Sequence, residues 1–325
     1  MIHDDIPRSE PPQATRRQRI WQRWKAFNDS DLVWLFWRSK STVVAFTCCV
    51  LILFCSLTSH WIAPHNVFDT TTFDLMDSEL PPAWMSGGDA RFLFGTDVQG
   101  RDVLSLMLYG LNISLVIGIS SVVISVALGV ALGVLSGYFG GLVDTLIMRF
   151  ADAMLSVPTI MFTLLVSGVA RVAIPKDWIG HFAPVILIGA IALTGWMQYA
   201  RTVRGLTLLE KGREYVMASR ISGASHLHIM LAHIVPNVMR PVLVMATLHL
   251  GVAILTEATL SFLGVGMPPD QPSLGTLINE GNQYLFSGQW WIVVFPATLL
   301  VILSLSFNLL GDWLTDVLNP KLRQE

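Results

Sequence analysis

The stretch LNISLVIGISSVVISVALGVALGVLS, from Leu111 to Ser136, contains no Asp, Glu, Lys or Arg. A helix that crosses a membrane needs about 20 mostly apolar residues, so this stretch predicts a transmembrane helix. Other apolar stretches predict five more spans, at approximately 42–63, 145–169, 183–200, 240–263 and 290–310. We therefore expect an all-α membrane protein with six transmembrane helices, of which Pro158 interrupts the third and Pro296 the sixth.

Small residues recur at every fourth position of the second span, at Ser121, Ser125, Gly129, Gly133 and Gly137. Lipid gives helices no hydrophobic reason to associate, and small side chains let two backbones approach closely enough for dispersion forces to hold them. This stripe predicts tight packing against another helix, either of this chain or of a partner.

Composition indicates that lipid is the main environment of the chain. Only 14% of the 325 residues are charged, against about 25% in soluble domains, and 53% are hydrophobic. The net charge of −2 gives no sign of a nucleic-acid partner.

Lys and Arg are distributed unevenly between the predicted loops, which sets the orientation. Of the 21, 17 lie in the two tails, at the start of the third span and between spans four and five. The others are Arg91, Arg101, Arg171 and Lys176. Because positive loops stay inside, we expect both termini and the 205–237 segment in the cytoplasm and the 64–104 loop in the periplasm.

Residues 1–41 form a predicted cytoplasmic tail, and residues 42–325 form the predicted six-helix transmembrane domain. The tail is rich in Trp, Phe and basic residues, and aromatic rings favour the headgroup layer of a membrane. This pattern predicts an interfacial helix that starts near Asp31, or an aromatic belt that only anchors the first span.

Signatures of catalysis are absent from the sequence. It has no glycine-rich phosphate loop, no paired-histidine zinc helix and no serine elbow, so we expect no enzyme activity and no cofactor in this chain. His226, His228 and His233 have no Cys or carboxylate at ligand spacing, which favours ordinary loop histidines over a metal site.

The segment EYVMASRISGASHLHIMLAHIVPN, residues 214–237, is much longer than a turn requires. It predicts a helix over 214–222, a break at Gly223, a second helix capped by Ser225, and an end at Pro236-Asn237 before the fifth span. Small side chains on the first helix suit insertion into a groove of a partner protein. The pattern equally fits an amphipathic hairpin that only covers the helix bundle.

This segment resembles the cytoplasmic EAA loop of permease subunits in ABC importers, in the form found in the dipeptide and oligopeptide permease family. Met217, Ser219 and Val235 depart from the family's pattern, and Met217 stands where the Glu-Ala-Ala core has its glutamate. In that family the loop docks on an ATPase subunit. The resemblance gives this role to the matching residues Glu214, Tyr215, Ala218, Arg220, Gly223, Ala224, Ser225, Pro236 and Asn237.

Further motifs extend the resemblance over residues 35–323. They match the family's landmarks before and after the second span, at the end of the fifth and sixth spans, and near the C-terminus: Phe94–Leu104, Ser136–Gly141, Leu260–Gly266, Phe307–Asp312 and Asn319–Lys321. Several motifs in the family's order make a stronger signal than any one of them alone.

The resemblance implies the fold of a type I ABC importer permease in the bacterial inner membrane. It implies a pore-forming subunit for di- and oligopeptides that forms a heterodimer with a second permease. Two ABC ATPases would bind ATP and Mg²⁺ and hydrolyse the ATP, and a periplasmic or extracellular binding protein would deliver the peptide. Nickel complexes and glutathione, carried by other members of this permease type, stay open as cargo, and so does a stand-alone channel or secondary transporter.

A few charged residues lie within the predicted spans. Glu257 lies in the fifth span, where an acid costs about 2.5–3.5 kcal/mol and therefore faces a partner or a cavity. It either lines the translocation path and meets the peptide's amino end, or makes a structural hydrogen bond to a neighbouring helix. Arg149 and Asp152, three residues apart on the third span, are expected to pair with each other.

The polar motif from Gly95 to Asp102, just before the second span, also has two readings. Thr96 or Asp97 is able to cap the helix that follows. Alternatively the motif receives the binding protein, for which Asp97, Arg101 and Asp102 are the candidate docking residues.

Overall fold

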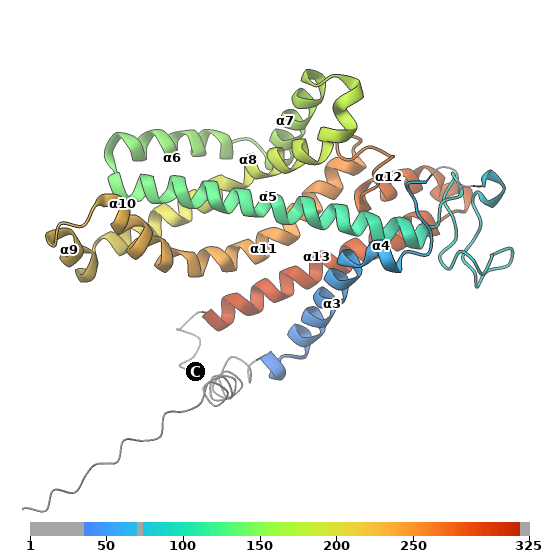
Figure 1. Ribbon diagram of the computed structural model, residues 1–325, viewed down its shortest axis with the longest axis horizontal. Helices are drawn as coiled ribbons and strands as arrows, with labels where there is room; N and C mark the ends of the chain where they lie inside the picture. Colours follow the sequence, from blue (N-terminus) through green and yellow to red (C-terminus); the bar gives the residue numbers. More distant parts are fainter. Residues whose placement is uncertain (1–35, 70–73, 319–325) are drawn as a thin grey trace, which may run out of the picture.

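The computed structural model of the protein describes residues 36–69 and 74–318. Within these ranges the regular structure is helical, apart from one isolated bridge between Thr96 and Asp102. Helices long and apolar enough to cross a membrane are α3 (Lys40–Leu57), α5 (Val103–Phe139), α8 (Lys176–Lys211), α11 (Val235–Phe262) and α13 (Trp291–Leu318). These helices lie side by side in one bundle (Figure 1), which confirms the all-α, multi-span architecture.

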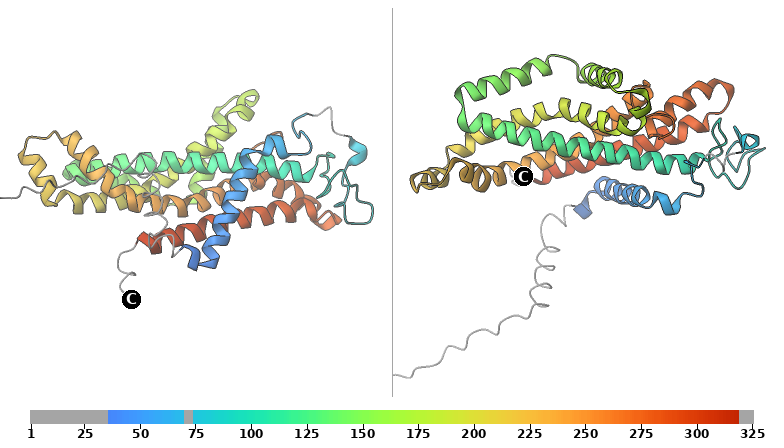
Figure 2. Two further views of the ribbon diagram at one scale, coloured as in Figure 1. Left: turned by 60° about the horizontal axis from the view of Figure 1, so that its bottom comes forward. Right: turned by 45° about the horizontal axis from the view of Figure 1, so that its top comes forward.

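The third predicted span is a broken helix. Helices α6 (Gly141–Leu155) and α7 (Thr159–Ala173) meet at an angle of 95°, and the pair counts as a sixth span only if both halves belong to one crossing. Pro158 has extended backbone angles, and its ring prevents α6 from continuing. Figure 2 shows α7 turned away from the direction of α6, so the effect of Pro158 is a right-angled break. Pro296, by contrast, lies inside the continuous helix α13, so the predicted interruption there is wrong.

Short helices and loops gather at the two ends of the bundle (Figure 1). One end holds α4 (Ser59–Ile62), η2 (Leu75–Asp77), α12 (Leu274–Tyr284) and η4 (Leu285–Ser287). The other holds α9 (Glu214–Ile221), α10 (His226–His228) and the π-helical turn η3 (Ile229–Ile234). We call them the outer end and the inner end, after the orientation expected from the sequence, which stays a prediction.

The stripe of small residues on α5 packs against α8 of the same chain. A Cβ atom added at Gly133 would lie 2.6 Å from the carbonyl oxygen of Ala200, and one at Gly137 would lie 2.7 Å from Cβ of Thr207. Ser125 continues the same contact, because its hydroxyl donates to the carbonyl of Ala192 at 3.3 Å. The two backbones are therefore as close as the sequence pattern predicted, and the partner helix is identified.

Helix α5 extends beyond the predicted span at both ends. Its 37 residues correspond to about 55 Å, against a hydrocarbon layer of about 30 Å. Gly140 and Gly141 both have positive φ, which lets the chain reverse from α5 into α6. The interfacial helix predicted near Asp31 lies outside the described residues.

Candidate functional site

The inner loop forms two short helices, as the sequence predicts. Helix α9 ends at Ile221, and Gly223 follows it with a φ of +82°, a conformation that favours glycine. The hydroxyl of Ser225 then accepts a hydrogen bond from the backbone N–H of His228 at 3.3 Å, which caps α10. The break at Gly223 and the cap at Ser225 are therefore confirmed.

The predicted end at Pro236-Asn237 is wrong, because α10 continues through η3 into α11 without a loop. Pro236 lacks a backbone N–H and its ring would press on the preceding helical turn. The wider π-helical turn over Ile229–Ile234 lies directly before this proline, at the place where the strain would fall. The second loop helix is therefore the first part of a transmembrane helix, and a force on one reaches the other directly.

The back of the inner loop is fixed to the bundle by a cluster of apolar side chains. Val216 of α9 is buried, and so are Ile229 and Ile234 of η3. They pack in one cluster with Val203 of α8 and Val134 of α5. The loop is thus a packed part of the bundle, unlike a freely hanging hairpin.

Polar contacts join α9 to the helices on both sides of it. The hydroxyl of Tyr215 donates to the carboxylate of Glu210, and this hydrogen bond raises the pKa of Tyr215 above its ordinary value. The Asn237 amide donates to the Tyr215 hydroxyl at 3.0 Å and to the carbonyl of His233 at 2.7 Å. Tyr215 therefore links the end of α8 to the start of α11.

The front of the inner loop is exposed, and it carries apolar side chains. Ile221 is 87% exposed and Met217 is 50% exposed, although neither belongs to a candidate span. Of the predicted coupling residues, Ala224 is half-buried and the rest are exposed: Glu214, Tyr215, Ala218, Arg220, Gly223, Ser225, Pro236 and Asn237. The structure brings them together on one loop unit. Sequence reasoning missed Ile221, whose signal was an aliphatic residue between Arg220 and Ser222 outside any span.

At the outer end, the cap of α5 is Asp102, so the prediction of Thr96 or Asp97 is wrong. The Asp102 carboxylate accepts from the backbone N–H of Ser105 at 3.0 Å. Asp97 instead holds its own turn, because it accepts from the backbone N–H groups of Gln99 and Arg101, each at 2.8 Å. The helix begins eight residues before the predicted span, and the cap moves with it.

Arg101 is buried, and its guanidinium joins the outer motif to the half-buried Glu280 of α12. Its guanidinium lies 2.6 Å from the carboxylate of Asp97 and 3.0 Å from that of Glu280. Burial raises the pKa of Glu280, while Arg101 acts in the opposite direction. The side chains of the motif are all less than 5% exposed: Asp97, Arg101 and Asp102. They therefore stabilise the fold beneath the outer surface and form almost none of that surface themselves. Sequence reasoning missed Glu280, which lies far away in the chain.

Glu257 is fully buried in α11 and bonded to serines. Its carboxylate accepts from the hydroxyl of Ser114 on α5 at 2.7 Å and from that of Ser261 at 2.7 Å. Ser114 also accepts from the backbone N–H of Leu274, the first residue of α12. This is the geometry of the structural alternative, and a contact between Glu257 and a peptide stays untested.

The charges of the broken span pair with α8. Asp152 lies 2.5 Å from Arg201, so the expected pair with Arg149 is replaced by one between helices. Asp144 likewise holds Arg204 at 2.5 Å and accepts from the hydroxyl of Ser136 at 2.5 Å. These pairs fix α6 against the inner half of α8.

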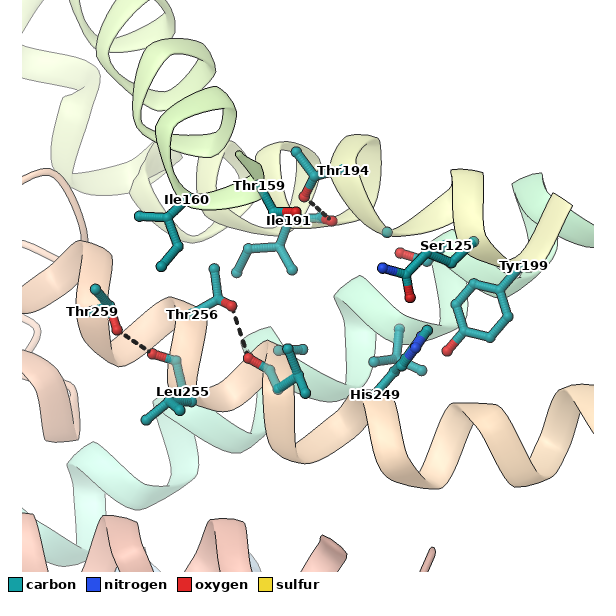
Figure 3. A pocket seen from close by; sticks show the side chains of 15 residues that line it. Ser125, Thr159, Ile160, Ile191, Thr194, Tyr199, His249, Leu255, Thr256 and Thr259 are labelled. Carbon is teal, nitrogen blue, oxygen red and sulfur yellow. Dashed lines mark hydrogen bonds between the residues drawn. The ribbon is translucent and has the colours of Figure 1, made fainter. Parts of the chain in front are cut away.

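A partly open cavity of about 350 Å³ lies between α5, α7, α8 and α11 (Figure 3), and its lining includes the exposed side chains of Ile160, Val252 and Leu255. Polar side chains from all four of these helices line it, among them Ser125, Thr159, Gln198 and His249. In the described part of the chain, no three His, Cys, Asp or Glu residues are placed to hold a metal ion. Sequence reasoning missed the cavity, because its polar residues are spread over separate apolar spans.

Comparison with known proteins identifies relatives over nearly the whole chain. It is 40% identical to the dipeptide transport system permease protein of Escherichia coli (strain K12), over 97% of each chain. It is 37% identical to the di/tripeptide transport system permease protein of Pseudomonas aeruginosa (strain UCBPP-PA14), over 89% of this chain and 92% of that one. It is 36% identical to the oligopeptide transport system permease protein of Bacillus subtilis (strain 168), over 88% of each.

A solved structure, described as an amino acid ABC transporter with histidines, is also similar, with a TM-score of 0.48 and 18% identity over 64% of this chain and 92% of that one. That likeness is too partial to carry an assignment. Residues 129–324 match the sequence profile of the binding-protein-dependent transport system inner membrane components. With this match and relatives of 36–40% identity, the chain belongs to that family and is a multi-pass inner membrane protein.

Proposed function

We propose that the chain is a pore-forming subunit of an ATP-driven importer of short peptides. The relatives are permeases for dipeptides, di/tripeptides and oligopeptides, which supports this cargo. ATP and Mg²⁺ would bind to two partner ATPases, and this chain would hydrolyse nothing itself. A second permease would complete the pore as a heterodimer, and a binding protein would deliver the peptide at the outer end.

The inner loop has one exposed face and one face packed on the bundle, and this observation supports the coupling role. Its front exposes Ile221, Met217 and the small Ala218, while its back is anchored through Val216. An exposed aliphatic side chain in a polar loop is the kind of anchor that a groove on a partner protein buries. Because η3 and α11 are continuous, a displaced loop moves the transmembrane helix with it.

The outer motif would serve the binding protein indirectly. Its charged side chains are buried, so they hold the shape of the surface that the binding protein meets. The outer end also exposes Phe286, which is 98% exposed.

Replacing Ile221 with glutamate tests the coupling role. The chain is tagged, expressed with its partner subunits and purified from membranes in mild detergent, and the co-purified ATPase is quantified. We expect Ile221→Glu to lower the ATPase yield at least about tenfold, since burying an unpaired carboxylate adds to the loss of an aliphatic anchor. The amount of the second permease recovered should not change.

Phe286→Glu is the matched control, because it places the same charge on another apolar residue that is more than 85% exposed, at the other end of the bundle. This variant should retain the ATPase. Equal ATPase yields from both variants would contradict the proposed docking role of α9. Peptide uptake by proteoliposomes that contain the whole complex, with and without ATP, tests the cargo.

A further inference from the structure

The last turn of α5 and the chain reversal after it carry the motif SGYFGG, residues 136–141. The Ser136 hydroxyl donates to Asp144 of α6 at 2.5 Å, and Asp144 pairs with Arg204 of α8. At Gly137 the two backbones are so close that an added Cβ would lie 2.9 Å from the carbonyl oxygen of Arg204. The motif is therefore a junction between α5, α6 and α8 at the inner end of the bundle.

Tyr138 connects this junction to the inner loop. Its hydroxyl is hydrogen-bonded at 2.8 Å to Nδ1 of His226, the first residue of α10, and the two rings meet edge-on at 5.6 Å between centroids. The ring of Phe139 also meets that of His226 edge-on, at 6.1 Å. Tyr138 is buried, whereas His226 is exposed. Two aromatic side chains at the end of α5 therefore hold the start of α10, and Figure 1 shows α10 beside that end of α5.

The end of α8 contacts the same tyrosine. Lys211, the last residue of α8, donates to the backbone carbonyl of Tyr138. Its ammonium nitrogen also lies 5.5 Å from the centroid of the Tyr138 ring, where the negative face of the ring attracts a cation. Tyr138 therefore joins the ends of α5 and α8 to the start of α10.

Helix α5 differs from α11 in how a movement of the inner loop can reach it. Helix α10 continues into α11, so α11 follows the loop through the chain itself. Helix α5 is not next to the loop in the chain, so only noncovalent contacts can move it. The apolar contacts behind the loop, such as that of Val134 with Ile229, have no preferred direction. The hydrogen bond between Tyr138 and His226 requires a defined geometry, so it fixes the position of the loop relative to α5.

We propose that Tyr138 is a positioning residue that passes an ATP-driven movement of the inner loop, through His226, to α5 and α8. The proposal rests on the proposed function, in which the loop docks on a partner ATPase. Because α5 and α8 are packed backbone against backbone at Gly133 and Gly137, a force on the end of α5 moves both helices together. Without the hydrogen bond, the loop moves on its ATPase while α5 lags behind, and less peptide is transported for each ATP hydrolysed.

The test uses the complete complex in proteoliposomes with a dipeptide-loaded binding protein, and it measures the labelled dipeptide taken up per ATP hydrolysed. Tyr138→Phe removes the hydroxyl but keeps the ring and the backbone carbonyl that Lys211 contacts. We expect the ratio to fall about fivefold, which corresponds to one net hydrogen bond. The melting temperature and the amount of co-purified ATPase should match the wild type, because water can replace the partner of the exposed His226 and the front of the loop is unchanged.

Tyr109→Phe is the matched control, because Tyr109 lies on the same helix near the outer end and its hydroxyl is 3.4 Å from Nδ1 of another histidine, His60. This variant should keep the wild-type ratio. A wild-type ratio for Tyr138→Phe, or equal losses for both variants, would overturn the proposal. A lower melting temperature or a lost ATPase in Tyr138→Phe would also overturn it, because the defect would then lie in folding or docking. A wild-type complex without ATP-dependent dipeptide uptake would instead refute the proposed function.

A double-mutant cycle tests whether Tyr138 acts through His226. His226→Ala should lower the ratio by a similar factor, and the double variant should be no worse than either single variant, because both changes remove the same contact. Losses that multiply in the double variant would overturn the proposal, since the two residues would then act independently.

Discussion

The outer motif and the inner loop carry equally clear sequence patterns, yet they use their residues in opposite ways. In the outer motif, Asp97, Arg101 and Asp102 are buried, and their hydrogen bonds and ion pairs are made within the chain. In the inner loop, Ile221 is 87% exposed and Met217 is 50% exposed, and no described residue covers the outward face of either side chain. The difference indicates that the outer motif stabilises the local fold, while the inner loop presents a surface to another protein.

The largest loss of stability is expected when the charge of Arg101, at the centre of the outer motif, is removed. Arg101→Met leaves the buried carboxylate of Asp97 and the half-buried carboxylate of Glu280 without their partner. Breaking a buried ion pair in this way costs about 3–5 kcal/mol in the free energy of unfolding. Denaturant titration in detergent measures this loss.

Arg91→Met is the control for that variant, since Arg91 pairs with Asp77 and Asp89 in the same loop but is exposed. It should unfold at nearly the same denaturant concentration as the wild type. If the two arginine variants lose the same stability, the buried ion pairs of the outer motif do not stabilise the fold more than the exposed ones do.

A smaller effect is expected at the start of α5. Asp102→Ala removes the side chain that accepts from the backbone N–H of Ser105, and the loss of such a cap costs about 1 kcal/mol. Asp102→Asn keeps an oxygen at the same position and should recover most of that stability. A loss confined to transport, with stability unchanged in Asp102→Ala, would show that the residue acts on the binding protein.

We expect the difference in stability between Glu280→Gln and the wild type to depend on pH, because burial raises the pKa of Glu280. A raised pKa means that the folded state holds the proton more tightly than the unfolded state, so stability from this group is present below its ordinary pKa of 4.5. It is lost as the pH rises through the higher, folded-state value. Glu280→Gln, which cannot ionise, should therefore gain stability relative to the wild type between acidic and neutral pH.

Melting temperatures of Glu280→Gln and the wild type at a series of pH values measure that difference. A gap that stays constant across the series, or that moves in the other direction, would mean that Glu280 is not desolvated as the structure places it.

The smallest effect on stability is expected in the inner loop. Ile221→Glu places a charge on an exposed helix face, so the free energy of unfolding of the isolated subunit should change by less than about 0.5 kcal/mol. The same variant is expected to lose the ATPase. A large loss of stability would show that Ile221 packs within the subunit and would remove the contrast with Arg101.

The sequence predicted the elements that depend on local pattern. The apolar spans, the close contact made by the small residues of α5, the break at Gly223 and the cap at Ser225 all follow from composition and spacing along one segment. The residues of the inner loop could be grouped for the same reason, because they lie within 24 consecutive positions.

The remaining features depend on contacts between distant segments. Glu280 reaches Arg101 from α12, and the cavity combines residues from α5, α7, α8 and α11, none of which is unusual in its own helix. The cap of α5 was misplaced because polar residues before a helix offer several candidates, and only the position of the first turn selects Asp102. The angle at Pro158 depends on how α7 packs against α8, which a single proline does not specify.

Photo-crosslinking in native membranes tests the central claim most directly. A benzophenone amino acid is placed at Ile221 or, for comparison, at Met76, which is 85% exposed in the outer loop. We predict a crosslink between position 221 and an ABC ATPase, which position 76 does not form. A crosslink to the ATPase from position 76, or none from position 221 in an assembled and active complex, would contradict both the docking role of α9 and the orientation assigned to the chain.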